Sequence, residues 1–178
     1  MELTLDFLEN IKSCPEGIDF FNGEEDKDIA SLTYKALDLD KYWLAEFVGM
    51  HRMNKVQQIE FLTAKIEKVI ELWEDEETEQ VVKDELKFVK AAIKQLKDKK
   101  LKTKKLSRFR GKKRVTIPGL EGAVNMLLLF DLDDTGIKSM PEIAVLLDSS
   151  FPRKLIYDEQ EELCIIAMDI LGDKKTPK

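Results

Sequence analysis

Residues 24–110 contain a single glycine, Gly49, and no proline. Because these two residues most often end helices and build tight turns, such a stretch favours helices over a succession of short strands. Most of the other glycines and prolines gather near 15–23, 111–122 and 136–152. The chain is therefore expected to be an all-α, multi-helix protein.

Two consecutive segments carry apolar residues at alternating steps of three and four. They are Ile59, Leu62, Ile66, Val69 and Trp73 in the first segment, and Val82, Leu86, Val89, Ile93 and Leu96 in the second. The acidic run 74–77 separates the two. This heptad spacing predicts a long antiparallel helical hairpin over about 54–105, with coiled-coil-like packing between its helices.

Shorter helices are expected on both sides of this hairpin. Apolar residues at helical spacing place them at 4–13, 28–39, 42–50, 140–148 and 158–171. The segment 14–17 is expected to break the first of them, and the apolar run 120–130 is either a buried helix or a buried strand. The predicted divisions are an N-terminal cluster of short helices, the hairpin, a basic extended linker and a C-terminal helical part (1–52, 53–106, 107–118 and 119–178).

The charge of the chain is strongly segregated. Between Lys90 and Arg114 there are thirteen Lys and Arg and one acid, whereas the remaining residues hold sixteen bases and thirty-four acids. The lysines of 90–97 continue a helix that begins acidic and ends basic, which suits the helix macrodipole and needs no ligand. The unexplained charge is that of residues 99–114, called the basic segment from here on.

The basic segment is expected to contact the phosphates of a nucleic acid, because each neutralised phosphate releases counterions. Phe109 lies between two arginines, and aromatic rings and guanidinium planes stack on unpaired bases. The candidate binding residues are Lys99, Lys102, Lys104, Lys105, Arg108, Phe109, Arg110, Lys112, Lys113 and Arg114. An acidic protein surface is the alternative partner, and a solvated helix end is a third interpretation.

The same pattern also suits a protein-interaction, adaptor or inhibitor module. Residues 1–89 carry a net charge of −12 and could dock on a basic surface. The hairpin would offer a helical face to a partner or to a second copy of the chain. The protein is expected to be no enzyme and to need no cofactor, since His51 is its only histidine and no glycine-rich phosphate loop is present.

Residues 131–136 resemble two known motifs. Asp131, Asp133 and Thr135 follow an apolar run, as in the phosphoryl-acceptor motif of haloacid-dehalogenase-like phosphatases, in which Asp131 would be the nucleophile and Asp133 the acid/base. The segments before them, however, have the pattern of helices rather than of the alternating strands and helices of that family. The run 131–142 also resembles an EF-hand calcium loop, in which Lys138 stands where an aliphatic residue is usual.

The interpretation that we favour for this region is a helix start, with Ser139 as N-cap and Glu142 completing a capping box. Residues 139–149 also resemble the positioning helix of a helix-turn-helix motif. A recognition helix would then begin near Pro152 and run directly into the acidic stretch after Tyr157, which would repel phosphate.

Cellular location is constrained by what the sequence lacks. No apolar run approaches the ~20 residues that a membrane span needs, and the first ten residues have no basic leader. Cys14 and Cys164 are far apart in the sequence and are expected to be free thiols, as is usual in a reducing compartment. A cytoplasmic protein without a membrane partner is expected.

Overall fold

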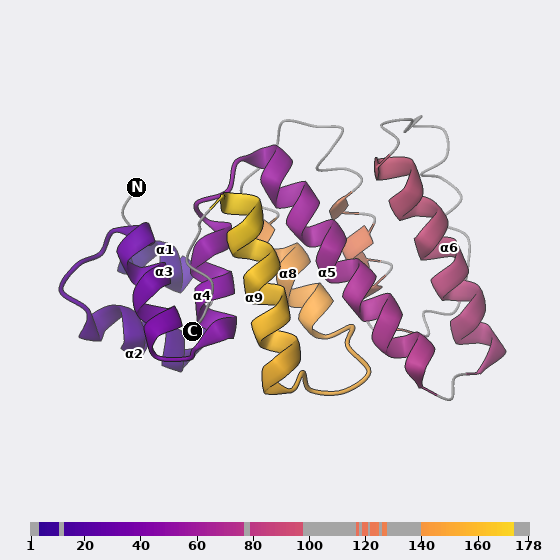
Figure 1. Ribbon diagram of the computed structural model, residues 1–178, viewed down its shortest axis with the longest axis horizontal. Coiled ribbons are helices and arrows are strands. Elements are labelled where there is room, and N and C mark those ends of the chain that lie inside the picture. The colour runs from indigo at the N-terminus through magenta and orange to yellow at the C-terminus, as the bar shows by residue number, and fades with distance from the viewer. Residues whose placement is uncertain are drawn as a thin grey trace. The chain divides into compact units, whose positions relative to one another are not determined.

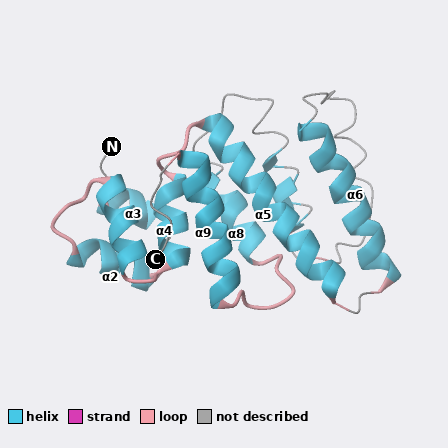
Figure 2. Ribbon diagram, in the orientation of Figure 1, coloured by secondary structure: helices cyan, strands magenta, loops and turns pink. Residues whose placement is uncertain are grey.

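The computed structural model describes residues 4–10, 13–76, 79–97 and 140–172, together with 117, 119, 120, 122–124, 126 and 127. Every regular element among these residues is a helix (Figure 2), which confirms the all-α class. None of the described helices is long and apolar enough to cross a membrane. The chain forms two compact units: residues 1–58 with 155–178 are unit 1, and residues 59–154 are unit 2.

Unit 1 holds mostly short helices. They are α1 (Leu5–Asn10), α2 (Pro15–Gly23), α3 (Ile29–Asp38), α4 (Tyr42–Met50), the first turn of α5 (Lys55–Asp75) and α9 (Tyr157–Leu171). Helix α2 was not predicted from the sequence, because Pro15 was interpreted only as a helix breaker. Pro15 instead occupies the first turn of α2, where its fixed φ suits a helix and its missing N–H is not needed.

The core of unit 1 is built around α4, which packs against α3 and α9 (Figure 1). Tyr42 at the start of α4 meets Tyr157 at the start of α9, with ring centroids 4.9 Å apart. At the other end, a Cβ on Gly49 would lie only 2.9 Å from Cε of Met168. The two helices are therefore parallel, and the last described helix packs with the N-terminal ones, which the sequence did not predict.

Unit 2 is centred on the remainder of α5, with α6 (Gln80–Lys97) and α8 (Met140–Asp148). The predicted heptad positions Leu62, Ile66 and Val69 are fully buried, and so is Phe61 on another side of the helix. The described residues between 120 and 127 are helical and largely buried. For these residues the interpretation as a buried helix is therefore correct, and the interpretation as a buried strand is wrong.

α6 lies beside the later part of α5 (Figure 1). Lys90 of α6 is 2.7 Å from Glu74 of α5, and residues of both helices line a common groove. Residues 98–105 lie outside the described part of the chain. The full hairpin over 54–105 and its coiled-coil-like packing therefore stay a prediction, as does the four-part division of the chain.

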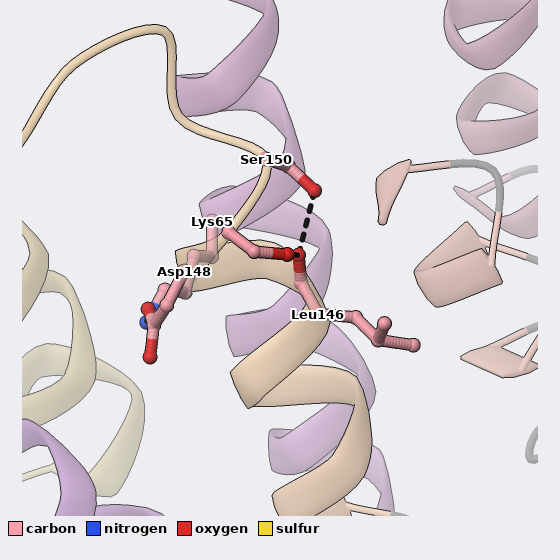
Figure 3. Close-up of polar contacts among 5 residues, drawn as sticks. Lys65, Leu146, Asp148 and Ser150 are labelled. Atoms are coloured by element: carbon pink, nitrogen blue, oxygen red, sulfur yellow. Dashed lines mark hydrogen bonds and ion pairs between the residues drawn. The ribbon is translucent and has the colours of Figure 1, made fainter. Parts of the chain in front are cut away.

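Gly119 packs against the end of α8. Its φ is +78°, and a Cβ there would lie 2.5 Å from the Leu146 carbonyl oxygen. The hydroxyls of Ser149 and Ser150 each donate to that carbonyl at 2.7 Å, the second of which Figure 3 shows. Trp73 of α5 donates from Nε1 to the Ser150 carbonyl at 2.7 Å. The end of α8 is thus held by α5 on one side and contacted by Gly119 on another.

Replacing Gly119 with alanine should lower the free energy of unfolding by at least ~2 kcal/mol, because a Cβ disfavours the left-handed backbone and clashes with a carbonyl. Gly23→Ala is the matched control, since a Cβ at Gly23 meets nothing within 4 Å. Urea unfolding of both variants measures the difference. Equal midpoints for the two would show that Gly119 is not constrained in this way.

Candidate functional site

All ten candidate binding residues of the basic segment lie outside the residues that the structure describes. They are Lys99, Lys102, Lys104, Lys105, Arg108, Phe109, Arg110, Lys112, Lys113 and Arg114. The structure does describe the parts of the chain on either side of them, which are α6 as far as Lys97 and the residue Ile117. Lys97 and Ile117 are called the two anchors of the basic segment, and the charged residues near them are described next.

After the basic segment, the chain contacts α6 again at Ile117. The backbone N–H of Ile117 donates to Oε2 of Glu85 at 3.2 Å, and the Ile117 side chain is fully buried. Glu85 lies twelve residues before Lys97 on the same helix, or about 18 Å at 1.5 Å per residue. The chain therefore enters the basic segment at the C-terminal end of α6 and is fixed again beside its N-terminal half.

A row of exposed lysines leads along α6 toward the basic segment. Its members are Lys83, Lys87, Lys90 and Lys94, whose spacing places them along one side of the helix. They line a groove, divided into two parts of about 500 Å³ each, whose α5 side is acidic: Glu67, Glu71, Glu74 and Asp75. The α5 wall of the groove is therefore acidic, whereas the α6 wall carries four lysines and one acid, Asp84.

One ion pair crosses this groove. Lys90 Nζ donates to both carboxylate oxygens of Glu74 at 2.7 Å. Both side chains are about half exposed, so the pair adds at most ~1 kcal/mol of stability. Acids on the facing wall also weaken the attraction of neighbouring lysines for phosphate, because opposite charges close together partly offset each other. This supports the interpretation that Lys90 needs no external ligand.

A second basic residue of unit 2, Lys65, is paired with an acid within the fold. Lys65 of α5 has a side chain only 4% exposed, and its Nζ lies 2.7 Å from Oδ1 of Asp148 at the end of α8 (Figure 3). A buried ammonium is stable only when it is paired, so this contact ties α8 to α5. Lys65 is therefore a structural residue.

Of the segment 131–142, which carries the two motif resemblances, the structure describes only residues 140–142. α8 begins at Met140, one residue after Ser139, where the predicted N-cap would place its start. Ser139, the side chain of Glu142 and the aspartates of the phosphatase-like and EF-hand-like interpretations lie outside the described residues. No group of His, Cys, Asp and Glu in the described part of the chain could hold a metal ion.

The helix-turn-helix interpretation is wrong. It requires a recognition helix that begins near Pro152 and carries Arg153 and Lys154. In the structure these residues lie in the connection between α8 and α9, and α9 begins at Tyr157. The acidic first turn of α9 favours that later start, because carboxylates stabilise a helix N-terminus.

The two cysteines and the histidine belong to no candidate metal site in the described part of the chain. Cys14 is exposed and Cys164 is buried, and both are free thiols, as predicted. Burial raises the pKa of the Cys164 thiol to about 12, so it is protonated and unreactive at neutral pH. His51 occupies the C-cap of α4, at the helix end where the sequence placed it. Its ring packs edge-on against Phe47, and burial lowers its pKa to about 4.

Comparison with known proteins gives no relative for this chain: no protein-family model, no curated protein and no solved structure matches it. A functional assignment therefore rests on the residues themselves. One surface was missed from the sequence. It consists of exposed apolar residues at the α3–α4 turn and at the start of α9. Leu39 was assigned to the apolar face of the predicted helix 28–39, and Ile156 and Tyr157 precede the predicted helix 158–171.

The low pKa of His51 makes a contribution to stability that depends on pH. Below pH 6.5 the unfolded chain binds a proton that the folded chain takes up only near pH 4. Stability is therefore lost as the pH falls through this window, by up to about 3 kcal/mol in total. We predict that the free energy of unfolding, measured with urea, falls more between pH 7.5 and pH 4.5 for the native protein than for His51→Gln. An equal difference in both proteins would contradict the assignment of this effect to His51.

The N-cap and calcium interpretations of residues 131–142 predict different responses to calcium. A cap needs no ion, so the melting temperature should be the same in millimolar calcium and in excess chelator. A functional calcium loop would raise it, because a ligand that binds only the folded state stabilises that state. Differential scanning calorimetry of the full chain decides between the two, and a calcium-dependent rise would overturn the cap.

Proposed function

We propose that the protein is a non-enzymatic binding protein whose basic segment contacts the phosphate backbone of a nucleic acid. The observation that carries this proposal is a contrast between neighbouring sets of basic residues. On α6 the lysine row faces the acidic wall of α5, and Lys90 is paired with Glu74. Residues 99–114 hold ten Lys and Arg and not one acid.

The anchors on either side favour an external partner for this charge. The chain enters the basic segment from α6 and is fixed again by Ile117 at Glu85, so both flanks belong to the same unit. Near those flanks the acids of α5 already face the lysines of α6. The positive charge that no acid of the same segment balances thus lies in the basic segment, where it would raise the local concentration of a polyanion.

The expected binding mode follows from the residue types. Lysines and arginines would neutralise phosphates without reading base sequence, so affinity should fall steeply with salt. Phe109, between Arg108 and Arg110, would stack on an unpaired base, a contact worth roughly 1–3 kcal/mol. Single-stranded nucleic acid is therefore the preferred ligand of this proposal.

Two variants that each remove four positive charges test the proposal. In the first, Arg108, Arg110, Lys112 and Lys113 become alanine; in the second, the row Lys83, Lys87, Lys90 and Lys94 becomes alanine. The first should weaken binding to a labelled single-stranded 20-mer by at least about tenfold and reduce the salt slope by about 3. The second should change both much less, because its lysines already face carboxylates. Fluorescence anisotropy between 50 and 200 mM salt measures both quantities.

Two outcomes would contradict the proposal. The absence of binding to any DNA or RNA at ~50 mM salt, where phosphate contacts are strongest, would exclude a nucleic-acid partner. Equal losses in the two variants would mean that net charge alone governs binding and that the basic segment has no special part. The ratio of absorbance at 260 and 280 nm, before and after a high-salt wash, gives an independent check on nucleic acid carried through purification.

A further inference from the structure

Three large apolar side chains are exposed at one end of unit 1. Leu39, in the turn between α3 and α4, is 48% exposed, and Ile156 and Tyr157 at the start of α9 are 53% and 52% exposed. The contact between Tyr157 and Tyr42, three residues after Leu39, brings the α3–α4 turn and the start of α9 together. These three residues are called the Tyr157 patch.

Hydrogen bonds hold the Tyr157 side chain and the backbone of Ile156 in place. The hydroxyls of Tyr157 and of buried Tyr42 are hydrogen-bonded to each other at 3.0 Å, and the two rings meet edge to face. The backbone N–H of Ile156 donates to Oε2 of Glu159 at 3.0 Å, which fixes the start of α9. Side chains that are exposed but already ordered lose little entropy when a partner covers them, as at the rigid aromatic anchors of binding surfaces.

Exposed carboxylates lie next to the patch in the sequence, together with two lysines: Lys41, whose Nζ is paired with Glu16 at 2.9 Å, and exposed Lys154. Asp38, Asp40 and Asp158 are exposed beside its members in the sequence. The hydrogen bond with Tyr157 and burial raise the pKa of Tyr42, and the charges of Glu161 and Asp40 add to this effect. The surface combines an apolar centre with a negative rim, and such a rim repels nucleic acid and anionic membranes.

Asp40 occupies a backbone position where glycine is usual. Its φ is +52°, in the left-handed region. The bonds from its N–H to the Leu37 carbonyl and from the Lys41 N–H to the Ala36 carbonyl form a Schellman motif that ends α3. The end of α9 has a glycine, Gly172, in the same conformation. A carboxylate at the strained position adds negative charge to the rim at some expense to the fold.

From these observations we infer that the Tyr157 patch docks a basic, amphipathic segment of a partner protein. Aliphatic side chains of that segment would cover Leu39 and Ile156. A lysine or arginine would lie over the ring of Tyr157 and close to the rim carboxylates, where cation–π attraction and charge complementarity act together. This inference does not depend on the basic segment or on nucleic-acid binding.

The test uses the full chain and a defined probe. The probe is a fluorescent peptide with leucines at positions i, i+3, i+4 and i+7 and lysine or arginine elsewhere; its comparison is a scrambled peptide of the same composition. The apolar variant is Leu39→Ser with Ile156→Ser, and its control is Val56→Ser, whose side chain is 71% exposed in the first turn of α5. The charge variant is Asp40→Gly, and its control is the double variant Asp19→Asn, Glu25→Gln, at two exposed acids outside the rim.

We expect the native protein to bind the amphipathic peptide more tightly than the scrambled one. The apolar variant should weaken binding by at least about tenfold, and Asp40→Gly by several-fold, while both controls stay within about twofold. Asp40→Gly should also melt at or above the native temperature, because glycine accepts the left-handed backbone without strain. Weaker binding together with an unimpaired fold identifies the carboxylate as part of a binding surface.

Other results would overturn the inference. These are equal binding of the scrambled peptide, no binding of either peptide, or equal losses in the variants and their controls. Binding of the single-stranded 20-mer should be unchanged in the apolar variant. This separates the Tyr157 patch from the proposed nucleic-acid function, since either can fail without the other.

Discussion

The burial of α5 within unit 2 is the constraint on which the rest of the account depends. Because α5 is covered on several sides, its charged residues must either pair within the fold or lie on its one exposed strip. Lys65 pairs with Asp148, and the acids of the exposed strip face the lysine row of α6. This arrangement places acids opposite the lysines of α6, whereas the basic segment contains no acid that could balance its charge.

Local patterns predicted much of the fold. The bounds of α4 and α8 are those predicted from apolar spacing, and the heptad positions of α5 and α6 near their centres are buried. The packing of α9 on α4 could not be predicted, because it joins residues more than a hundred positions apart that share no periodic pattern. Pro15 shows a different limit, since the same residue can end one helix and begin another.

The two candidate sites also differ in how far the sequence alone could predict them. The basic segment is visible in the sequence because charge density is a local property, although the sequence does not show that Lys90 is neutralised by Glu74 across a groove. The Tyr157 patch is invisible in the sequence, because the exposure of Leu39, Ile156 and Tyr157 depends on how α3, α4 and α9 meet. We therefore propose two interaction surfaces of opposite sign for this chain, one for a polyanion and one for a basic protein segment.

The central claim is that nucleic acid contacts residues 99–114. Photo-crosslinking of the intact protein to a single-stranded oligonucleotide with photoreactive bases, followed by peptide mapping, tests it most directly. The account predicts that the crosslinks fall within residues 99–114, with Phe109 among the modified residues, and that they disappear as salt rises. Crosslinks confined to other parts of the chain, or none at low salt, would contradict it.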